Sequence, residues 1–231
     1  MRLNLERQFS GPWVALQRFA LRRLVSSYEP YQPVTLGKQS LAKGDRACTD
    51  RWLVIAHVLQ QTGSHSMLDL GCAEGFFVQE AARQDGCIAI GVDADRRRLN
   101  VARSTASLNE VHRAGFIYAM VDADLLACLP SFDVVLFLSV LHHVMYEHGV
   151  DYAAALMRAI HDRTNKCLIF DMGQSDETKH EWSNLLPKMT PSPKEWIAAF
   201  LRDCGYTTVT PIAETDAYKS QVRRQLFTAY P

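Results

Sequence analysis

The amino-acid sequence predicts an α/β protein with a Rossmann-like, doubly wound sheet of seven strands, mostly parallel, whose last strand is antiparallel. From residue 51 onward, short apolar runs alternate with segments of helical period, as in a parallel sheet covered by helices on both faces. The run "LDLGCAEG", residues 68–75, places a glycine-containing turn between a strand and a helix. No helix separates the last two strands, so they must pair antiparallel if they are neighbours.

The first 50 residues are expected to form a helix and a linker, and residues 51–231 are expected to form the α/β domain. The segment 12–30 places Trp13, Leu16, Ala20 and Leu24 on one helical stripe with arginines beside it. This amphipathic basic helix could pack on the domain as a lid, or residues 10–25 could lie on the anionic surface of the inner membrane. Residues 28–50 contain two prolines and two glycines and are predicted to be an irregular linker.

Helices are predicted where apolar residues recur every three or four positions, and strands where short apolar runs are continuous. The predicted helices are 51–63, 76–86, 95–111, 149–164 and 194–205. The predicted strands are 66–71, 87–95, 115–124, 131–144, 166–173, 206–214 and 223–230, and the fourth of them runs into a turn. Right-handed crossovers in such a sheet place the ligand at the carboxyl ends of the strands.

Composition narrows the functional classes. A chain of 231 residues with 48% hydrophobic residues is long enough for one domain of this kind. Its 25 basic and 25 acidic residues cancel, which argues against a nucleic-acid partner. The six cysteines form no C-x-x-C pair, so we expect reduced thiols and a cytoplasmic location. No apolar run approaches the ~18 residues of a membrane span, and no signal peptide is recognised at the N-terminus.

The turn at residues 71–75 indicates the kind of ligand. A dinucleotide-binding turn places three glycines against a pyrophosphate, whereas this turn reads G-C-A-E-G. Glu74 is expected to face the phosphate position and to disfavour an anionic ligand by charge repulsion. Asp93 ends the next strand, where a carboxylate suits the hydroxyls of a ribose. A cationic nucleoside such as S-adenosylmethionine satisfies both expectations.

These segments, together with "MVDADLL" at 120–126 and "FDVVLFLSVLHHV" at 132–144, resemble the class I S-adenosylmethionine-dependent methyltransferases over most of residues 50–231. The resemblance implies that Asp69 lies near the methionine part, Asp93 near the ribose and Asp122 near the adenine amine. Arg51 could grip the cofactor's carboxylate, or form a surface salt bridge instead. The residues expected around S-adenosylmethionine are Arg51, Asp69, Gly71, Cys72, Ala73, Gly75, Phe76, Phe77, Asp93, Ala94, Asp122, Ala123, Leu138 and Ser139.

A narrower resemblance rests on "LDLGCAEGFF", "FLSVLHHVMYEHGVD", "YQP" and "GDRACTDRWLVI". These segments are similar to the methyltransferase domain of the bifunctional kinase-methyltransferases that cap bacterial O-antigen polysaccharide chains. The resemblance implies O-methylation of a terminal sugar hydroxyl in lipopolysaccharide biosynthesis, hence a polar small-molecule or glycan acceptor. An RNA, tRNA or small-molecule methyltransferase is an alternative enzyme, and a non-catalytic cofactor-binding partner subunit is an alternative of another class.

Histidine is the usual general base near neutral pH, and methyl transfer to a hydroxyl requires removal of its proton. His142 and His143 at the end of the fourth strand, and His148 in the next turn, are therefore the candidate bases. Each could instead pack against backbone and only orient the turn. Asp171, at the end of the fifth strand, is a further acceptor-side candidate or caps a loop.

Four more residues are expected on the substrate side: Tyr31, Gln32, Glu181 and Trp182. Sugars stack on aromatic faces, although a tryptophan can equally fill the core. Tyr31 and Gln32 could also fold back on the cofactor's carboxylate. The histidines together with Glu147 do not predict a metal site, because adjacent residues on one turn seldom point to one centre.

Overall fold

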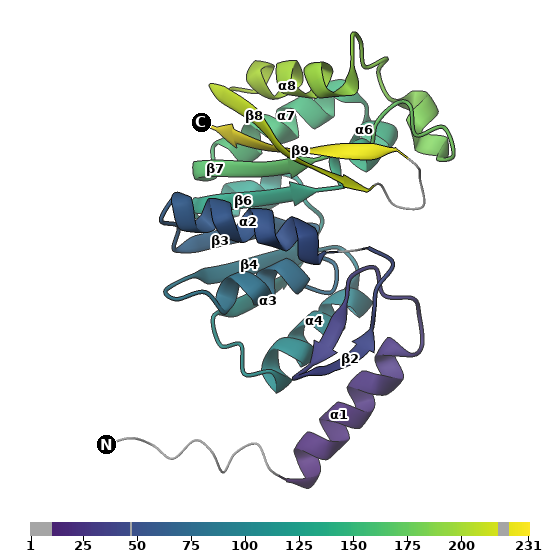
Figure 1. Ribbon diagram of the computed structural model, residues 1–231, viewed down its shortest axis with the longest axis vertical. Coiled ribbons are helices and arrows are strands. Elements are labelled where there is room, and N and C mark those ends of the chain that lie inside the picture. The colour runs from purple at the N-terminus through teal and green to yellow at the C-terminus, as the bar shows by residue number, and fades with distance from the viewer. Residues whose placement is uncertain (1–10, 47, 217–221) are drawn as a thin grey trace.

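Seven strands form one sheet in the computed structural model, which describes residues 11–46, 48–216 and 222–231 (Figure 1). The strands are β3 (Ser66–Leu70), β4 (Ile88–Asp93), β5 (Ala114–Tyr118), β6 (Phe132–Leu138), β7 (Thr164–Asp171), β8 (Thr208–Asp216) and β9 (Arg223–Tyr230). Their order across the sheet is β5-β4-β3-β6-β7-β9-β8. Strands β3 to β7 are parallel, and β9 runs antiparallel between β7 and β8. The predicted fold class is confirmed.

Helices cover both faces of the sheet. They are α2 (Thr49–Gln61), α3 (Phe76–Ala82), α4 (Arg96–Leu108), α5 (Ala123–Cys128), α6 (Leu141–His148), α7 (Val150–His161) and α8 (Pro193–Asp203), and a 3₁₀ turn, η2, spans Glu181–Leu185. Strand side chains alternate between two buried cores: Leu68 and Leu70 belong to the core under α7 and α8, whereas Met67 belongs to the core under α2 and α3. This two-residue period is that of a strand buried on both faces.

The order of the strands fixes where a ligand can bind. The chain leaves β3 toward β4 on one side and later returns to place β6 on the other side, so the strand order reverses between β3 and β6. In an open α/β sheet the connections diverge at such a point and leave a crevice at the carboxyl ends of the two strands.

The N-terminal helix α1 (Pro12–Val25) packs on α4 through a different face from the one that the sequence predicted. Its buried residues are Val14, Leu21 and Val25, and Leu21 and Val25 share a small core with Val101 of α4. The predicted stripe is mostly exposed, because three of its four residues, Trp13, Leu16 and Ala20, face solvent.

The predicted irregular linker contains a two-stranded antiparallel hairpin, β1 (Val34–Leu36) and β2 (Gln39–Ala42). Asn109 at the end of α4 holds this hairpin: its side chain accepts from the Gly37 backbone and donates to the Thr35 carbonyl. Residues 1–10 and Ala47 of the predicted extension lie outside the described residues.

Two short helices begin where the sequence predicted the ends of strands, because β5 ends at Tyr118 and β6 at Leu138. The turn expected after the fourth strand is the helix α6, which carries all three candidate histidines. Helix α5 begins inside the predicted third strand, because the Asp122 carboxylate accepts from the backbone amide of Leu125 and caps it. Within the described ranges, no helix is both long and apolar enough to cross a lipid bilayer.

Substitution of Gly75, which precedes α3, would test how tightly this helix packs in the fold. The φ of Gly75 is +74°, and a Cβ atom there would lie 2.5 Å from Phe116 Cε1 and 3.0 Å from Ala102 Cβ. Gly63 also has a positive φ, +54°, but a Cβ atom there meets nothing within 4 Å. Both alanine variants bear the left-handed backbone cost of about 1–2 kcal/mol, and Gly75→Ala adds about 1–3 kcal/mol of overpacking.

We therefore expect chemical denaturation to give a clearly lower free energy of unfolding for Gly75→Ala than for Gly63→Ala. Equal losses in the two variants would show that Phe116 yields freely and does not require glycine at position 75.

Candidate active site

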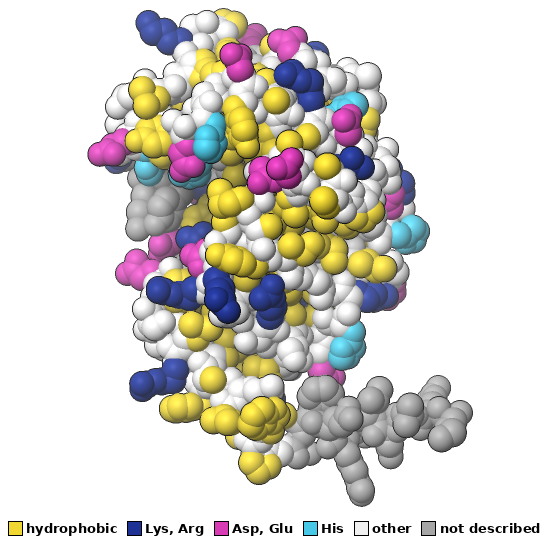
Figure 2. All heavy atoms as spheres, turned by 180° about the vertical axis from the view of Figure 1, so that it is seen from behind, with side chains coloured by type: hydrophobic (Ala, Val, Ile, Leu, Met, Phe, Trp, Pro, Cys, Tyr) yellow, Lys and Arg dark blue, Asp and Glu magenta, His cyan; other side chains and the backbone are white. Residues whose placement is uncertain are grey.

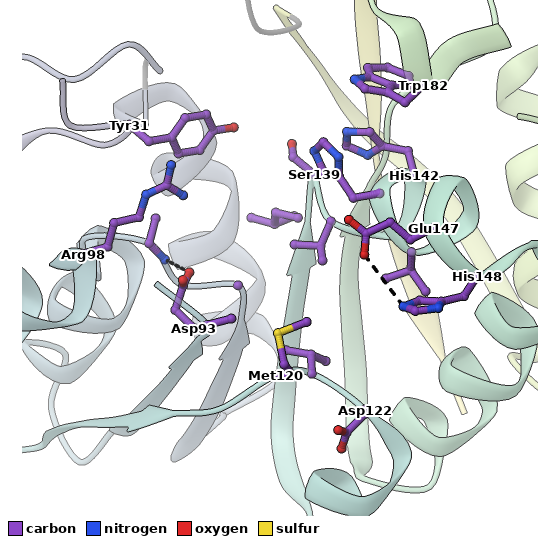
Figure 3. Close-up of a pocket in the computed structure, with 18 of the residues that line it drawn as sticks. Tyr31, Asp93, Arg98, Met120, Asp122, Ser139, His142, Glu147, His148 and Trp182 are labelled. Carbon is purple, nitrogen blue, oxygen red and sulfur yellow. Dashed lines mark hydrogen bonds and ion pairs between the residues drawn. The ribbon is translucent and has the colours of Figure 1, made fainter. Parts of the chain in front are cut away.

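A cavity of about 790 Å³ opens at the carboxyl ends of β3, β4 and β6, at the point where the strand order reverses. Its size suits a small-molecule ligand. Figure 3 shows two facing walls. The β4 wall carries Tyr31, Asp93 and Arg98, and the α6 wall carries His142, Glu147, His148 and Trp182. Ser139 lies between the walls, and Met120 and Asp122 lie on the β5 side.

The turn after β3 brings backbone to the cavity surface. Gly71 has a φ of +84°, and a Cβ atom there would lie 2.5 Å from Val140 Cγ2, so only glycine fits without displacement. The Ala73 amide donates to Asp93 Oδ2 at 2.7 Å, which fixes the turn to the end of β4 (Figure 3). Gly71, Ala73 and Asp93 line the cavity, as the sequence predicted.

Asp69 lies behind this turn with its carboxyl group buried. Burial, with a smaller effect from Asp93, raises the pKa of Asp69 to about 7, although Arg51 opposes the shift. Its Oδ2 atom is buried and has no hydrogen-bond partner among the described residues. A cationic amino group beside Asp69 would supply the missing partner and favour its ionised form.

Glu74 does not face the ligand, and the expectation that it repels an anionic ligand there is wrong. Its carboxylate is buried and turned toward the N-terminal segment. It accepts from the Tyr28 hydroxyl at 3.1 Å and from the backbone amides of Tyr31 and Gln32 at 3.1 and 2.9 Å. Glu74 therefore fastens residues 28–32 to the first turn, and this contact brings Tyr31 to the cavity.

Besides Asp69 and Arg51, five residues predicted around the cofactor do not line the cavity: Cys72, Gly75, Phe76, Phe77 and Ala123. Cys72 and Phe77 belong to the apolar core under α3, and Gly75 is required by Phe116 rather than by a ligand. The Phe76 amide donates to the Gln32 side chain. Ala94, Asp122, Leu138 and Ser139 do line the cavity.

Arg51 and Asp171 were predicted on separate sides of the site, but they form one buried ion pair. Arg51 Nη1 donates to Asp171 Oδ2 at 3.3 Å, and Arg46 Nη2 lies 3.8 Å from the same oxygen. Burial opposes ionisation of Asp171, yet Arg51 and Arg46 outweigh it and lower the pKa of this carboxyl below its usual value. Neither Arg51 nor Asp171 lines the cavity, so this geometry favours a structural role over proton transfer.

Arg224 on β9 joins this ion pair to the α6 wall. Its guanidinium grips the Glu177 carboxylate through two bonds of 2.7 and 2.8 Å and donates to Ser139 Oγ at 3.2 Å. Ser139 Oγ in turn donates to Asp171 Oδ1 at 2.8 Å. The Arg224 guanidinium also lies 5.7 Å from the centre of the Trp182 ring. Its charge is therefore neutralised by Glu177, although Arg224 borders the cavity.

His142 is fixed in one protonation form. The Gly173 backbone amide donates to His142 Nδ1 at 3.0 Å, and because an amide can only donate, Nδ1 is unprotonated and the neutral ring carries its hydrogen on Nε2. Burial, then the nearby Arg224, lowers the pKa of His142 well below its usual value. The neutral His142 ring, which borders the cavity, can therefore donate only from Nε2, and its Nδ1 is not available as a base.

His143 and His148 differ from His142 in exposure. His143 lines the cavity, and its partial withdrawal from water, followed by the effect of Arg224, lowers its pKa and keeps the ring neutral at pH 7. His148 lies at the exposed rim, 3.8 Å from Glu147 and against the Tyr152 ring. His143 therefore lines the cavity with an uncharged ring and, unlike His142, is exposed.

The four residues predicted on the substrate side separate into two pairs. Tyr31 and Trp182 line the cavity on opposite walls (Figure 3). Trp182 packs on His142 and stacks on His180. Gln32 is buried beneath the wall, where it bonds to Glu74 and Phe76, and Glu181 is exposed outside the cavity. Gln32 and Glu181 therefore do not border the ligand space.

Sequence reasoning missed several residues that border the cavity: Arg98, Met120, Glu147 as a lining residue, Tyr152, His180 and Arg224. Arg98 could have been found, because it lies in the first turn of the helix after Asp93. Arg224 gave no local signal, since it reaches Ser139 from 85 positions away.

The residues present fit S-adenosylmethionine. Gly71 and Ala73 offer backbone, Asp69 has an unpaired buried oxygen, and Asp93 and Asp122 place carboxylates along the β4 and β5 ends. In residues 11–46, 48–216 and 222–231, no group of three or more His, Cys, Asp or Glu side chains is arranged to hold a metal ion.

The doubly wound sheet and the glycine-containing turn after β3 are together those of a Rossmann-like methyltransferase. Residues 62–189, more than half of the chain, match the family described as Methyltransferase domain, and the chain belongs to that family. It is an S-adenosylmethionine-dependent methyltransferase, as the sequence predicted.

Known proteins resemble it over most of its length. The chain is 30% identical over 164 residues to the "O-antigen chain terminator bifunctional methyltransferase/kinase WbdD" of Escherichia coli, which covers 70% of this chain and 21% of that protein. A solved structure of WbdD with a kinase inhibitor covers 90% of this chain and 47% of that one, with 27% identity and a TM-score of 0.75. The chain thus spans about a fifth of the curated relatives and about half of the WbdD chains in these structures.

The N-terminal domain of EvdMO1, solved in the presence of SAH and D-fucose, covers 96% of this chain and 98% of that one. It is 18% identical with a TM-score of 0.67, and this likeness shows a shared fold.

Replacement of Glu74 by alanine should release residues 28–32 from the first turn. The amides of Tyr31 and Gln32 then lose their acceptor, so we expect their hydrogen exchange, followed by mass spectrometry, to become at least roughly tenfold faster. Glu80→Ala is the matched control, because Glu80 on α3 pairs with Arg83 and, within the described part of the chain, makes no contact with residues 28–32 that would be lost. Unchanged exchange in Glu74→Ala would refute the anchoring role.

The pKa of Asp69 predicts how stability depends on pH. An acid whose pKa is raised from 3.8 to about 7 on folding binds its proton more tightly in the folded state, so its contribution is fully present below pH 4 and is lost as pH rises to about 7. A tenfold difference in proton affinity corresponds to about 1.4 kcal/mol, so the loss amounts to a few kcal/mol.

Asp69→Asn removes this titration. We expect the variant to be more stable than the wild type at pH 8 and to lose that advantage near pH 4, as measured by urea unfolding at each pH. Parallel pH profiles of the two proteins would contradict a raised pKa at Asp69.

Proposed function

We propose that this methyltransferase O-methylates a hydroxyl of a terminal sugar on a bacterial surface glycan. The observation that carries the proposal is the composition of the α6 wall, where the neutral His143 lies 6.3 Å from the Trp182 ring and Tyr152 lines the same cavity. Aromatic faces suit the apolar faces of sugars, and a neutral imidazole can accept a hydroxyl proton.

The electrostatics of this wall support an uncharged acceptor. Arg224 is bound in two places by Glu177, and the pKa values of His142 and His143 are lowered, so these three residues offer no free positive charge to an anionic group. The names of the WbdD relatives, which refer to termination of an O-antigen chain, support a glycan acceptor. The D-fucose present with EvdMO1 belongs to that protein and is consistent with a sugar site in this fold.

When bound, S-adenosylmethionine supplies an electrophilic methyl group, whose transfer breaks a carbon–sulfur bond and leaves SAH. The residues of this chain then have three tasks. Asp93 and the backbone at Gly71 and Ala73, which line the cavity, would hold the methyl donor at the β4 wall, with the buried Asp69 behind them. The acceptor hydroxyl lies against the α6 wall, where His142 Nε2–H orients it as a donor. The hydroxyl proton passes to His143 as the new oxygen–carbon bond forms.

A cytoplasmic location agrees with the six cysteines, all of which are free thiols. Two alternative functions, RNA methylation and non-catalytic cofactor binding, predict different results. An RNA methyltransferase would bind RNA in a salt-dependent manner. A non-catalytic partner subunit would bind S-adenosylmethionine without turnover on any acceptor.

The test measures transfer of labelled methyl groups to oligosaccharides that end in a free hydroxyl and to the same oligosaccharides with a terminal phosphate. We expect turnover only on the hydroxyl series, with activity retained below pH 6.5 because the pKa of His143 lies below that value. Methylation confined to the phosphate series, or to RNA, would overturn the acceptor class.

His143→Gln should lower kcat by roughly 10²- to 10⁴-fold with little change in affinity for S-adenosylmethionine, because a base acts along the reaction path. His142→Gln should lower the melting temperature in addition to turnover, because it also disturbs the bond to Gly173. His112→Gln, at an exposed site outside the cavity, is the matched control. Near wild-type turnover of His143→Gln would exclude His143 as the base.

A further inference from the structure

Helix α1 has two apolar faces, and the fold uses only one of them. Val14 and Leu21 are buried, and the helix packs on α4 and β2. Trp13, Leu16 and Phe19 are 70%, 54% and 61% exposed. At roughly 100° per residue, Leu16 and Phe19 lie on the opposite side of the helix from Val14. A helix that is packed on one side normally presents polar residues on the other.

Positive charge accompanies this exposed apolar face. Arg18, Arg22 and Arg23 are all exposed on α1, and none of residues 11–27 is acidic. By the same roughly 100° per residue, Arg23 lies within the apolar face, whereas Arg18 and Arg22 lie on the side toward the β1–β2 hairpin, where Arg22 donates to Gln39. The net charge of the whole chain is zero, so this segment is a local concentration of one sign. An apolar face accompanied by arginines is the composition of helices that lie in the interface of an anionic membrane.

The position of α1 leaves this face free of the active site. The helix lies at one end of the molecule, beyond α4, and the first residue of the chain that lines the cavity is Tyr31 (Figure 1). Figure 2 shows apolar side chains gathered at this end, with basic side chains beside them. The helix packs on α4 and β2 without lining the cavity, so its exposed face is available for a contact of another kind.

A second copy of the chain fits this face poorly. In a symmetric dimer the same patch meets itself, and each copy would bring Arg18, Arg22 and Arg23 against those of the other. Like charges in contact oppose association, whereas anionic headgroups would be attracted to them.

We propose that α1 binds the surface of an anionic phospholipid bilayer, with Trp13, Leu16 and Phe19 inserted among the headgroups and Arg18, Arg22 and Arg23 paired with lipid phosphates. This inference does not depend on the acceptor, because no residue of α1 lines the cavity.

The test is co-sedimentation of the full chain with vesicles of phosphatidylcholine alone, or of phosphatidylcholine and phosphatidylglycerol in equal parts. We expect the protein to pellet with the anionic vesicles at low salt, to remain in solution with the neutral ones, and to be released as salt rises. The triple variant Arg18→Gln, Arg22→Gln, Arg23→Gln should bind the anionic vesicles roughly 10²-fold more weakly.

The triple variant Trp13→Ser, Leu16→Ser, Phe19→Ser should lose at least about tenfold in partitioning. Leu53→Ser is the matched control, since Leu53 is 65% exposed on α2 and should leave binding unchanged. Unaltered affinity for S-adenosylmethionine shows that the variants are folded. Wild-type protein that stays in solution with anionic vesicles would overturn the proposal, as would variants that pellet like the wild type. A dimer that dissociates only in the apolar triple variant would assign the face to a second copy instead.

Discussion

A carboxylate buried at the carboxyl end of a strand requires a hydrogen-bond donor or a positively charged partner, and these pairings hold the segments of the site in place. Asp93 accepts from the backbone of the first turn, Asp171 pairs with Arg51, and Glu177 pairs with Arg224. A buried charge without a partner is strongly destabilising, so each of these pairs fixes the segments that supply it. Asp69 differs, because its Oδ2 has no partner among the described residues, and its raised pKa reflects that.

The same pairs connect the α6 wall to the interior of the sheet. Arg224 joins the segment that carries Trp182 to Ser139, and Ser139 bonds to Asp171 in the middle of the sheet. The chain of contacts continues through Arg51 into α2. A methyl donor and an acceptor must be aligned closely for in-line transfer, and a wall that is held by the sheet serves that alignment. The α6 wall presents imidazole and aromatic rings and the Glu147 carboxylate to the cavity.

The N-terminal segment combines two separate contacts. Residues 28–32 are held at the active site by Glu74, whereas α1 packs against α4 and turns an apolar face to solvent. The carboxylate that the turn sequence seemed to direct at a ligand therefore serves to attach this segment. Binding of α1 to a surface would therefore leave the cavity uncovered, because no residue of α1 lines it.

The sequence alone determined the layers of the sheet, the antiparallel last strand and the identity of the first turn. These depend on local periodicity and on glycines whose backbone angles no other residue adopts readily, and both are visible along the chain. Tertiary structure decided the rest. The direction in which Glu74 points, the pairing of Arg51 with Asp171 across 120 positions and the arrival of Arg224 beside Ser139 all depend on segments distant in sequence. Periodicity likewise identified an amphipathic α1. Which of its two apolar faces is buried was decided by the packing of Leu21 and Val25 against Val101 of α4.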